Sequence, residues 1–214
     1  PLVNNTVCGD DFFEAAKATG HYVELDPTMS MEEAKKYAKD MDILYTDTWV
    51  DMEFFNNPAY KQQKEETLAK MMQEDEKICI LDADLAKPNG TTPLYEKFPD
   101  RCFDVGIAEA NMIGIAAGLS AYGYKPIAFT FAPFATRRVC DQIAISVAYA
   151  KQNVKIVGTD PGITAELNGG THMSFEDIAV VRSIPDMTIY DAVDDIQLSQ
   201  AIEQIMKLDT PVYI

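Results

Sequence analysis

Short apolar runs alternate with longer segments of helical period along the chain. Several runs, such as 78–81 and 127–130, are almost continuously apolar, which is typical of parallel strands covered on both faces. This alternation predicts an α/β fold with a three-layer, mainly parallel twisted sheet and helices on both faces. The expected strands are 22–25, 42–45, 78–81, 127–130, 154–157, 188–190 and 211–214, and the expected helices are 11–18, 31–39, 58–72, 109–122, 134–150, 175–181 and 196–206.

The chain changes character near residue 75. Glycine is rare before this point and frequent after it, and the polar stretch 73–77 can end a helix and lead into the next strand. We therefore expect a smaller Rossmann-like βαβ segment at 1–75, followed by a second domain at 76–214.

Composition narrows the function classes. The chain holds 34 acidic and 18 basic side chains, a formal net charge of −16. Nucleic acids and anionic membranes both require a concentrated basic face, so both are disfavoured as partners. No apolar run approaches the ~20 residues of a transmembrane helix, and we expect a soluble, acidic, globular protein. The cysteines stand far apart in apolar surroundings, at 8, 79, 102 and 140, which favours buried free thiols in a reducing compartment, the cytoplasm, over a zinc cluster.

Glu109 lies in the first turn of an expected helix whose other residues are nearly all apolar or small. A carboxylate at this position can simply complement the helix dipole. The alternative is a functional acid, because a carboxyl group at the mouth of a buried helix is costly unless it has a partner.

Aromatic residues and a long loop supply further candidates. We assign Phe129 to the core, whereas Phe131 and Phe134 either pack there or form a surface for a planar ligand beyond the carboxyl end of a strand. The loop 160–172 is rich in small residues and carries His172. Loops of this length are often functional, although a lone histidine is more often structural.

Together these elements resemble the pyrimidine-binding domain of transketolase, and more closely the separately encoded C-terminal section of bacterial transketolase-like proteins. The resemblance covers about residues 78–214. It rests on three ordered motifs, Val105-Gly106-Ile107-Ala108-Glu109-Ala110-Asn111-Met112, Phe134-Ala135-Thr136-Arg137-Arg138 and Asn168-Gly169-Gly170-Thr171-His172.

The resemblance implies thiamine diphosphate chemistry at a site shared with a partner. In that family the glutamate at the position of Glu109 bonds the cofactor's aminopyrimidine and activates it, so Glu109 is the expected catalytic and cofactor-binding acid. Phe134 matches the ring that stacks on the pyrimidine, and Phe131 lines the same pocket. His172 matches a catalytic contact to a substrate hydroxyl, and Asp84 lies in the cofactor-side loop that faces the partner domain.

Three positions depart from that family's pattern. Where transketolases acting on sugar phosphates place a serine and a histidine for the substrate phosphate, this chain has Pro88 and Asp160, and Asn168 replaces a specificity aspartate. An acid at Asp160 would repel a phosphate. We expect Asp160, Asn168 and His172 to face the substrate, with a different or unphosphorylated substrate and lost activity as the two open interpretations.

The other half of such a site is not recognisable in the sequence, which contains no Gly-Asp-Gly motif for Mg²⁺ and diphosphate. The resemblance implies that a diphosphate-binding transketolase subunit or domain, not this chain, holds Mg²⁺. It also implies a homodimer or heterotetramer and a chain that is inactive alone.

Residues of about 6–72 resemble a different family, through the stretch 42–52. It is similar to a strand and loop in the second domain of ornithine- and putrescine-type carbamoyltransferases, where Asp47, Asp51 and Met52 would be the amine contacts. That family's Ser-x-Arg-Thr-Arg motif is absent, and a purely structural βαβ unit is the alternative. A chain joining parts of two families can be a natural fusion, a designed chimera or an incorrectly assembled sequence.

The leading hypothesis is the pyrimidine-binding half of a thiamine diphosphate-dependent, transketolase-like enzyme for two-carbon (ketol) transfer. The alternatives are a non-catalytic α/β scaffold or binding module in which these residues are relics, and an amine-binding carbamoyltransferase fragment.

Overall fold

The computed structural model describes residues 18–19 and 58–214, and the chain divides into two compact units, Pro1–Trp49 and Val50–Ile214. The second unit carries all the elements discussed below. The strands expected at 22–25 and 42–45, the helix expected at 31–39 and all but the last residue of the helix expected at 11–18 lie outside the described residues. The same holds for the carbamoyltransferase-like positions Asp47, Asp51 and Met52.

Six strands of the second unit form one parallel sheet in the order β2-β1-β3-β4-β6-β5. This confirms the predicted α/β class and the parallel arrangement. The strands are β1 (Ile78–Asp82), β2 (Cys102–Asp104), β3 (Lys125–Phe131), β4 (Lys155–Thr159), β5 (Thr188–Ile189) and β6 (Val212–Tyr213).

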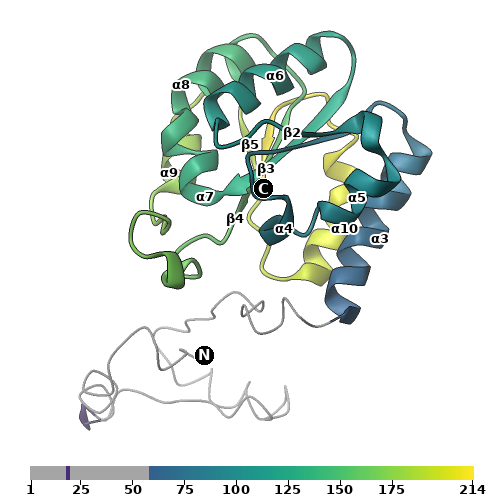
Figure 1. The fold of residues 1–214 in the computed structure, drawn as a ribbon. Coiled ribbons are helices and arrows are strands. Elements are labelled where there is room, and N and C mark those ends of the chain that lie inside the picture. The colour runs from purple at the N-terminus through teal and green to yellow at the C-terminus, as the bar shows by residue number, and fades with distance from the viewer. Residues whose placement is uncertain (1–17, 20–57) are drawn as a thin grey trace. The chain divides into compact units, whose positions relative to one another are not determined.

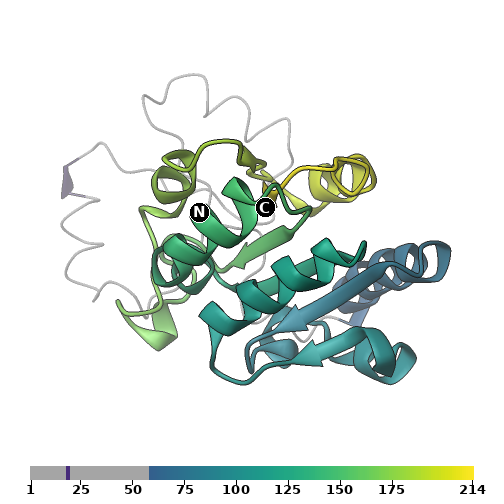
Figure 2. The same cartoon turned by 90° about the horizontal axis from the view of Figure 1, so that it is seen from above.

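Helices cover both faces of this sheet, and Figures 1 and 2 show α3, α5 and α10 on one side, with α6, α8 and α9 on the other. The sheet is therefore the middle of three layers, as predicted. The helices are α3 (Pro58–Glu74), α4 (Ala86–Asn89), α5 (Thr92–Lys97), α6 (Glu109–Ala121), α7 (Ala132–Ala135), α8 (Cys140–Gln142), α9 (Asp177–Arg182) and α10 (Asp195–Ile205).

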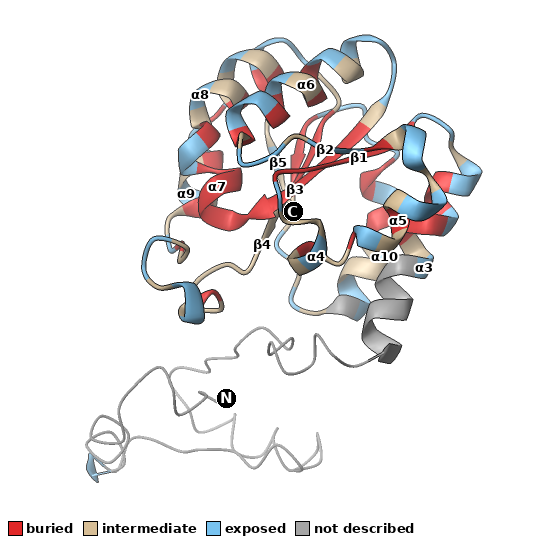
Figure 3. Cartoon of the chain, viewed as in Figure 1, coloured by how far each residue is buried: buried red, intermediate tan, exposed pale blue. Residues whose placement is uncertain are grey.

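The core is built by alternation along the strands, because successive strand residues point to opposite faces. Cys79 and Leu81 pack with Met112 of α6 in one apolar cluster, whereas Ile78 and Ile80 pack with α3 and α10 in the other. The central strands are consequently buried on both faces (Figure 3). Their continuous apolar runs in the sequence have this physical cause.

Helix α3 packs against the sheet of the second unit, through Leu68 and Met72 in the cluster that also holds Ile78 and Ile80. The sequence predicts that the second domain begins at residue 76, after this helix. The second compact unit begins earlier, at Val50, and therefore includes the helix. The charged stretch after the helix is a turn into β1, in which Asp75 is paired with Lys125 at 2.8 Å.

The prediction of a single helix at 134–150 is wrong. The chain instead forms α7, a 3₁₀ turn η3 (Arg137–Val139), α8 and a π-helical stretch η4 (Ile143–Tyr149). The break lies at Thr136, whose backbone has φ −126° and ψ −85° and whose hydroxyl donates to the Ala132 carbonyl at 2.6 Å. A hydroxyl bonded back by four residues competes with the regular helical ladder.

Lys155 begins β4 and is buried to 1% exposure. Its ammonium donates to the carbonyls of Leu208 at 2.7 Å and Thr210 at 2.9 Å, and to the Asn153 side chain. These bonds fasten the loop between α10 and β6 to the sheet. Burial lowers the pKa of Lys155 from 10.5 to about 8, although Asp209 opposes the shift.

Stability should therefore rise with pH through the range in which Lys155 titrates. The folded chain releases this proton near pH 8 and the unfolded chain near 10.5, so between these values the unfolded state binds more protons. Relative to Lys155→Met, we expect the free energy of unfolding of the native chain to increase by about 2 kcal/mol between pH 8 and 10.5, measured by urea unfolding. Parallel pH profiles of the two proteins would contradict this.

Candidate functional site

The candidate site lies at the carboxyl edge of the parallel sheet. From β1 the chain first moves to β2 on one side, and later places β3 on the other side of β1. This reversal of strand order is a topological switch point, where open α/β sheets bind ligands beyond the carboxyl ends of their strands. The side chains described below follow β1, β2, β3 and β4 at that edge.

Glu109 is the first residue of α6, and its side chain is only 5% exposed. The helix begins three residues after Gly106, which has φ 72°, and its N-cap residue Ala108 makes no side-chain hydrogen bond to the free amides of the first turn. The helix dipole favours a carboxylate at this position, but burial removes the water that would hydrate the carboxylate. Its partner is Arg138, whose Nη1 donates to Oε1 at 2.6 Å.

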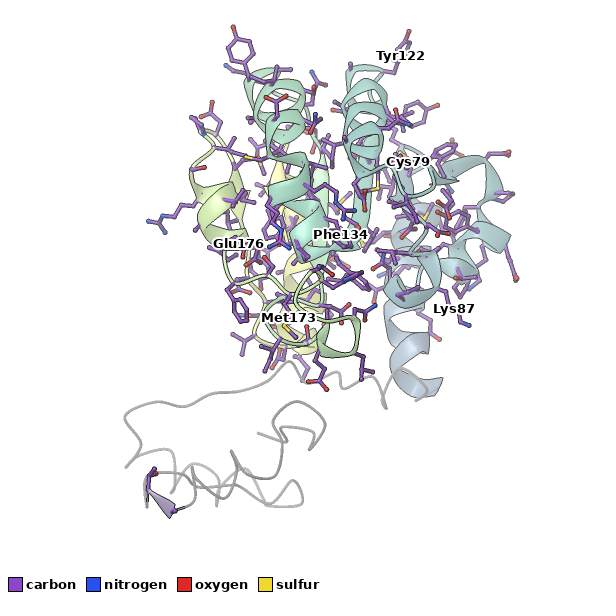
Figure 4. All side chains as sticks on the ribbon, turned by 60° about the vertical axis from the view of Figure 1, so that its left-hand side comes forward. Cys79, Lys87, Tyr122, Phe134, Met173 and Glu176 are labelled. Carbon is purple, nitrogen blue, oxygen red and sulfur yellow. The ribbon has the colours of Figure 1, made fainter. Side chains whose placement is uncertain are left out.

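Three rings form a wall beside this pair. Phe131 ends β3, Phe134 lies in α7, and the Phe134 ring centroid is 5.1 Å from that of His172 and 6.1 Å from that of Phe131. Figure 4 shows Phe134 beside the loop that carries Met173, the residue after His172. The Arg138 guanidinium carbon lies 3.6 Å from the Phe134 centroid, so one cation both covers this ring and pairs with Glu109.

The loop that carries His172 is held by a second arginine. Arg137 Nη1 donates to Glu176 Oε1 at 2.6 Å, and its Nη2 donates to the Thr171 carbonyl at 3.1 Å. The Thr171 hydroxyl lies 2.9 Å from His172 Nδ1. A hydrogen bond from the Phe175 amide, and then the Arg137 guanidinium, hold the pKa of the Glu176 carboxyl below its ordinary value. Two adjacent arginines thus make different contacts: Arg138 pairs with the buried Glu109, and Arg137 bonds the loop that carries His172.

A buried polar network fixes the loop after β1. Asp82, fully buried at the end of β1, accepts hydrogen bonds from Asn89 at 2.8 Å, Thr91 at 2.7 Å and Tyr95 at 3.1 Å. Burial raises the pKa of Asp82, while these three bonds oppose the rise. Thr159, at the end of β4, donates to Asn89 at 2.9 Å, so the network joins two strand ends.

Asp104 joins the loops on either side of the switch point. Its Oδ1 accepts from the backbone amides of Asp84 and Gly106, both at 2.9 Å. The first amide belongs to the loop after β1 and the second to the turn that begins α6. The Asp104 carboxylate therefore links the turn that leads to Glu109 with the loop that carries Asp84.

The structure brings four of the predicted site residues together: Glu109, Phe131, Phe134 and His172, with Arg138 linking the acid to the rings. The other three predicted residues lie on loops that follow β1 and β4. Asp84 is exposed with φ 60°, Asp160 is half-buried with φ 53°, and Asn168 is exposed at the end of a short 3₁₀ turn.

Sequence reasoning missed Arg138, Asp82 and Asp104. The arginine lies within a motif that we quoted, four residues after Phe134, but its reach to Glu109 depends on the break at Thr136. Asp82 ends an apolar strand, which is a usable signal for a buried acid at a sheet edge. Chemically, the cluster offers a planar ligand a ring to stack on and a buried acceptor for one N–H group.

Residues 56–214 match the family model described as "Transketolase, pyrimidine binding domain". A 6-deoxy-6-sulfo-D-fructose transketolase subunit SqwH from Clostridium sp. (strain MSTE9) is 56% identical over 147 residues, which are 69% of this chain and 46% of that protein. A 1-deoxy-D-xylulose-5-phosphate synthase from Lawsonia intracellularis is 34% identical over 157 residues, covering 73% of this chain and 24% of the synthase.

A solved structure of a split-gene transketolase, described as an inactive β4 tetramer, is 38% identical, with a TM-score of 0.63. The match covers 72% of this chain and 49% of that one. The chain thus spans less than half the length of the first curated relatives it matches.

Removing the charge of Glu176 should loosen the histidine loop. In Glu176→Gln the Arg137 bridge loses its ionic partner, and we expect the amides of residues 171–174 to exchange roughly threefold faster or more. Hydrogen exchange read by mass spectrometry checks this. The matched control is Glu203→Gln on α10, an exposed acid 3.9 Å from Lys70. Equal exchange in both variants would show that the bridge does not hold the loop.

Proposed function

The chain belongs to the family of transketolase pyrimidine-binding domains, and on that premise we propose that it is the pyrimidine-binding subunit of a split, thiamine diphosphate-dependent enzyme for two-carbon (ketol) transfer. The observation that carries the proposal is the buried Glu109 carboxylate beside the Phe134 ring, at the switch point of the sheet. The family's activated cofactor requires an acid and a stacking ring at such a place.

The residues of this site fit an aminopyrimidine. The Arg138 guanidinium, a flat cation with N–H donors, already lies over Phe134 and donates one N–H to Glu109. An aminopyrimidine protonated at N1′ is likewise flat and presents one N–H there. Both groups make the same two interactions, a charge-assisted hydrogen bond and a contact with a ring face.

When bound, the cofactor supplies the nucleophilic carbon that carries the two-carbon unit between sugars. Glu109 holds and moves a proton at N1′ of the aminopyrimidine, as a general acid and base in a site with little water. Phe134 stacks on the pyrimidine and Phe131 closes the same wall. His172, whose ring lies 5.1 Å from Phe134, contacts a substrate hydroxyl, and Asp84 faces the cofactor from the loop after β1.

We assign the diphosphate and its Mg²⁺ to a partner of the diphosphate-binding transketolase type, in a homodimer or a heterotetramer. The proposal is supported by the related split-gene transketolase, whose β4 tetramer is described as inactive. It is also supported by the relative named as a transketolase subunit. The free, buried thiols of Cys79 and Cys102 fit a reducing compartment, and we place the assembly in the cytoplasm.

The substrate we propose is a ketose whose end group is a sulfonate. Asp160 directly follows β4, where the resemblance puts a phosphate contact, and Pro88 replaces a second such contact. A sulfonate carries one negative charge, whereas a phosphate monoester carries about 1.5–2, so repulsion by Asp160 is weaker for the sulfonate. The relative that acts on 6-deoxy-6-sulfo-D-fructose is 56% identical over the matched region.

Calorimetric titration of thiamine diphosphate with Mg²⁺ tests the cofactor role. We expect binding only when the diphosphate-binding partner is present, and roughly tenfold weaker binding in the Glu109→Gln assembly, because an amide is a poorer partner for a protonated N1′. The control, Glu96→Gln, changes an exposed acid of α5.

Two outcomes would contradict the cofactor role. Absence of binding with the partner present would favour a non-catalytic scaffold, in which the site residues are relics. Equal cofactor affinity in the Glu109→Gln and native assemblies would show that the carboxylate does not contribute to cofactor binding.

Asp160→Asn tests the substrate proposal. Removing this charge should raise the kcat/KM of the assembled enzyme for fructose 6-phosphate, relative to that for 6-deoxy-6-sulfofructose, by about fivefold. Asp186→Asn, at an exposed position that also has a positive φ, is the control. An unchanged ratio between the two substrates would show that Asp160 does not discriminate between their end groups.

A further inference from the structure

We propose that Arg138 is a positioning residue that occupies the place of the aminopyrimidine in the free chain and leaves Glu109 when the cofactor binds. The inference rests on the proposed function, since it assigns a competitor to the same site. Its basis is a double contact: the guanidinium donates to Glu109 at 2.6 Å and lies 3.6 Å from the centroid of Phe134.

The two ends of this contact differ in their access to water. The Glu109 side chain is 5% exposed and the Arg138 side chain is 42% exposed. A carboxylate buried to this degree is strongly destabilising without a partner, whereas a half-exposed guanidinium regains its hydration when it rotates into solvent. Arg138 can therefore leave the pair, while Glu109 cannot be left alone.

The backbone beneath Arg138 is fixed. Thr136 and Val139 are fully buried, and the Thr136 hydroxyl is bonded to the Ala132 carbonyl. The neighbouring Arg137 is held by Glu176 and Thr171. Departure of Arg138 thus requires only rotation of its own side chain, and the loop that carries His172 can keep its place.

The exchange conserves the interactions of the buried acid. Before it, Glu109 accepts an N–H of Arg138 and Phe134 faces a cation; after it, Glu109 accepts N1′–H and Phe134 faces the pyrimidine. The free chain consequently keeps its active-site acid paired and in position. The consequence is a measurable penalty, because cofactor binding must first break the contacts of Arg138.

Substitution of Arg138 should relieve this competition. In the complex with the diphosphate-binding partner, Arg138→Met should bind thiamine diphosphate with Mg²⁺ about tenfold more tightly than the native chain, by calorimetry. Arg138→Lys should fall between them, since lysine pairs with a carboxylate but is not a flat donor. Arg182→Met, an exposed arginine in the last turn of α9, is the charge-matched control.

A second measurement separates competition from a structural effect. Methylguanidinium added to the Arg138→Met complex should weaken cofactor binding toward the native value and leave the native and Arg182→Met complexes unchanged. In the native free chain, the guanidinium proton signals of Arg138 should be shifted upfield by the Phe134 ring, and should return to solvent-like values when cofactor binds to the complex.

Three outcomes would overturn this inference. Cofactor binding that is unchanged or weaker in Arg138→Met would overturn the competition, even with the proposed function intact. Guanidinium signals without a ring-current shift in the free native chain would overturn it even if no Arg138 variant folds. Absence of cofactor binding to the native complex and to every variant would overturn the proposed function and this inference together.

Discussion

The fold removes the carboxylate of Glu109 from water, and an ion so placed costs several kcal/mol unless a donor faces it. The acid is the first residue of α6, a helix that packs against β3. Arg138 supplies the donor, and in doing so brings the break at Thr136, the ring of Phe134 and the helix terminus into one cluster. A ligand that uses Glu109 must provide an equivalent N–H.

The remainder of the carboxyl edge keeps this arrangement rigid. Asp82, buried at the end of β1, holds the following loop through three hydrogen bonds, and Asp104 ties that loop to the turn before α6. Asp82 and Asp104 thus hold the backbone that leads to Glu109. The Arg137–Glu176 bridge fixes the loop that carries His172.

None of the described helices has the length and apolar character that a bilayer crossing needs.

Much of this could be predicted from the sequence, for identifiable reasons. Strands with two buried faces have continuous apolar runs, so β1 and β3 were found, and the family resemblance implied that Glu109, Phe131, Phe134 and His172 share one site. The short helices α4 and α5 lack a readable period and were missed. The Glu109–Arg138 pair could not be read from the chain, because these residues meet only through the packing of α6 against η3 and the turn at Thr136. Pairing across elements is a tertiary property with no signature in local spacing.

A crystal structure of this chain assembled with a diphosphate-binding partner, Mg²⁺ and thiamine diphosphate tests the central claim most directly. The account predicts N1′ at about 2.8 Å from a Glu109 carboxylate oxygen, the pyrimidine over the Phe134 ring, and the Arg138 side chain turned toward solvent. An intact Glu109–Arg138 pair in the presence of bound cofactor would contradict it.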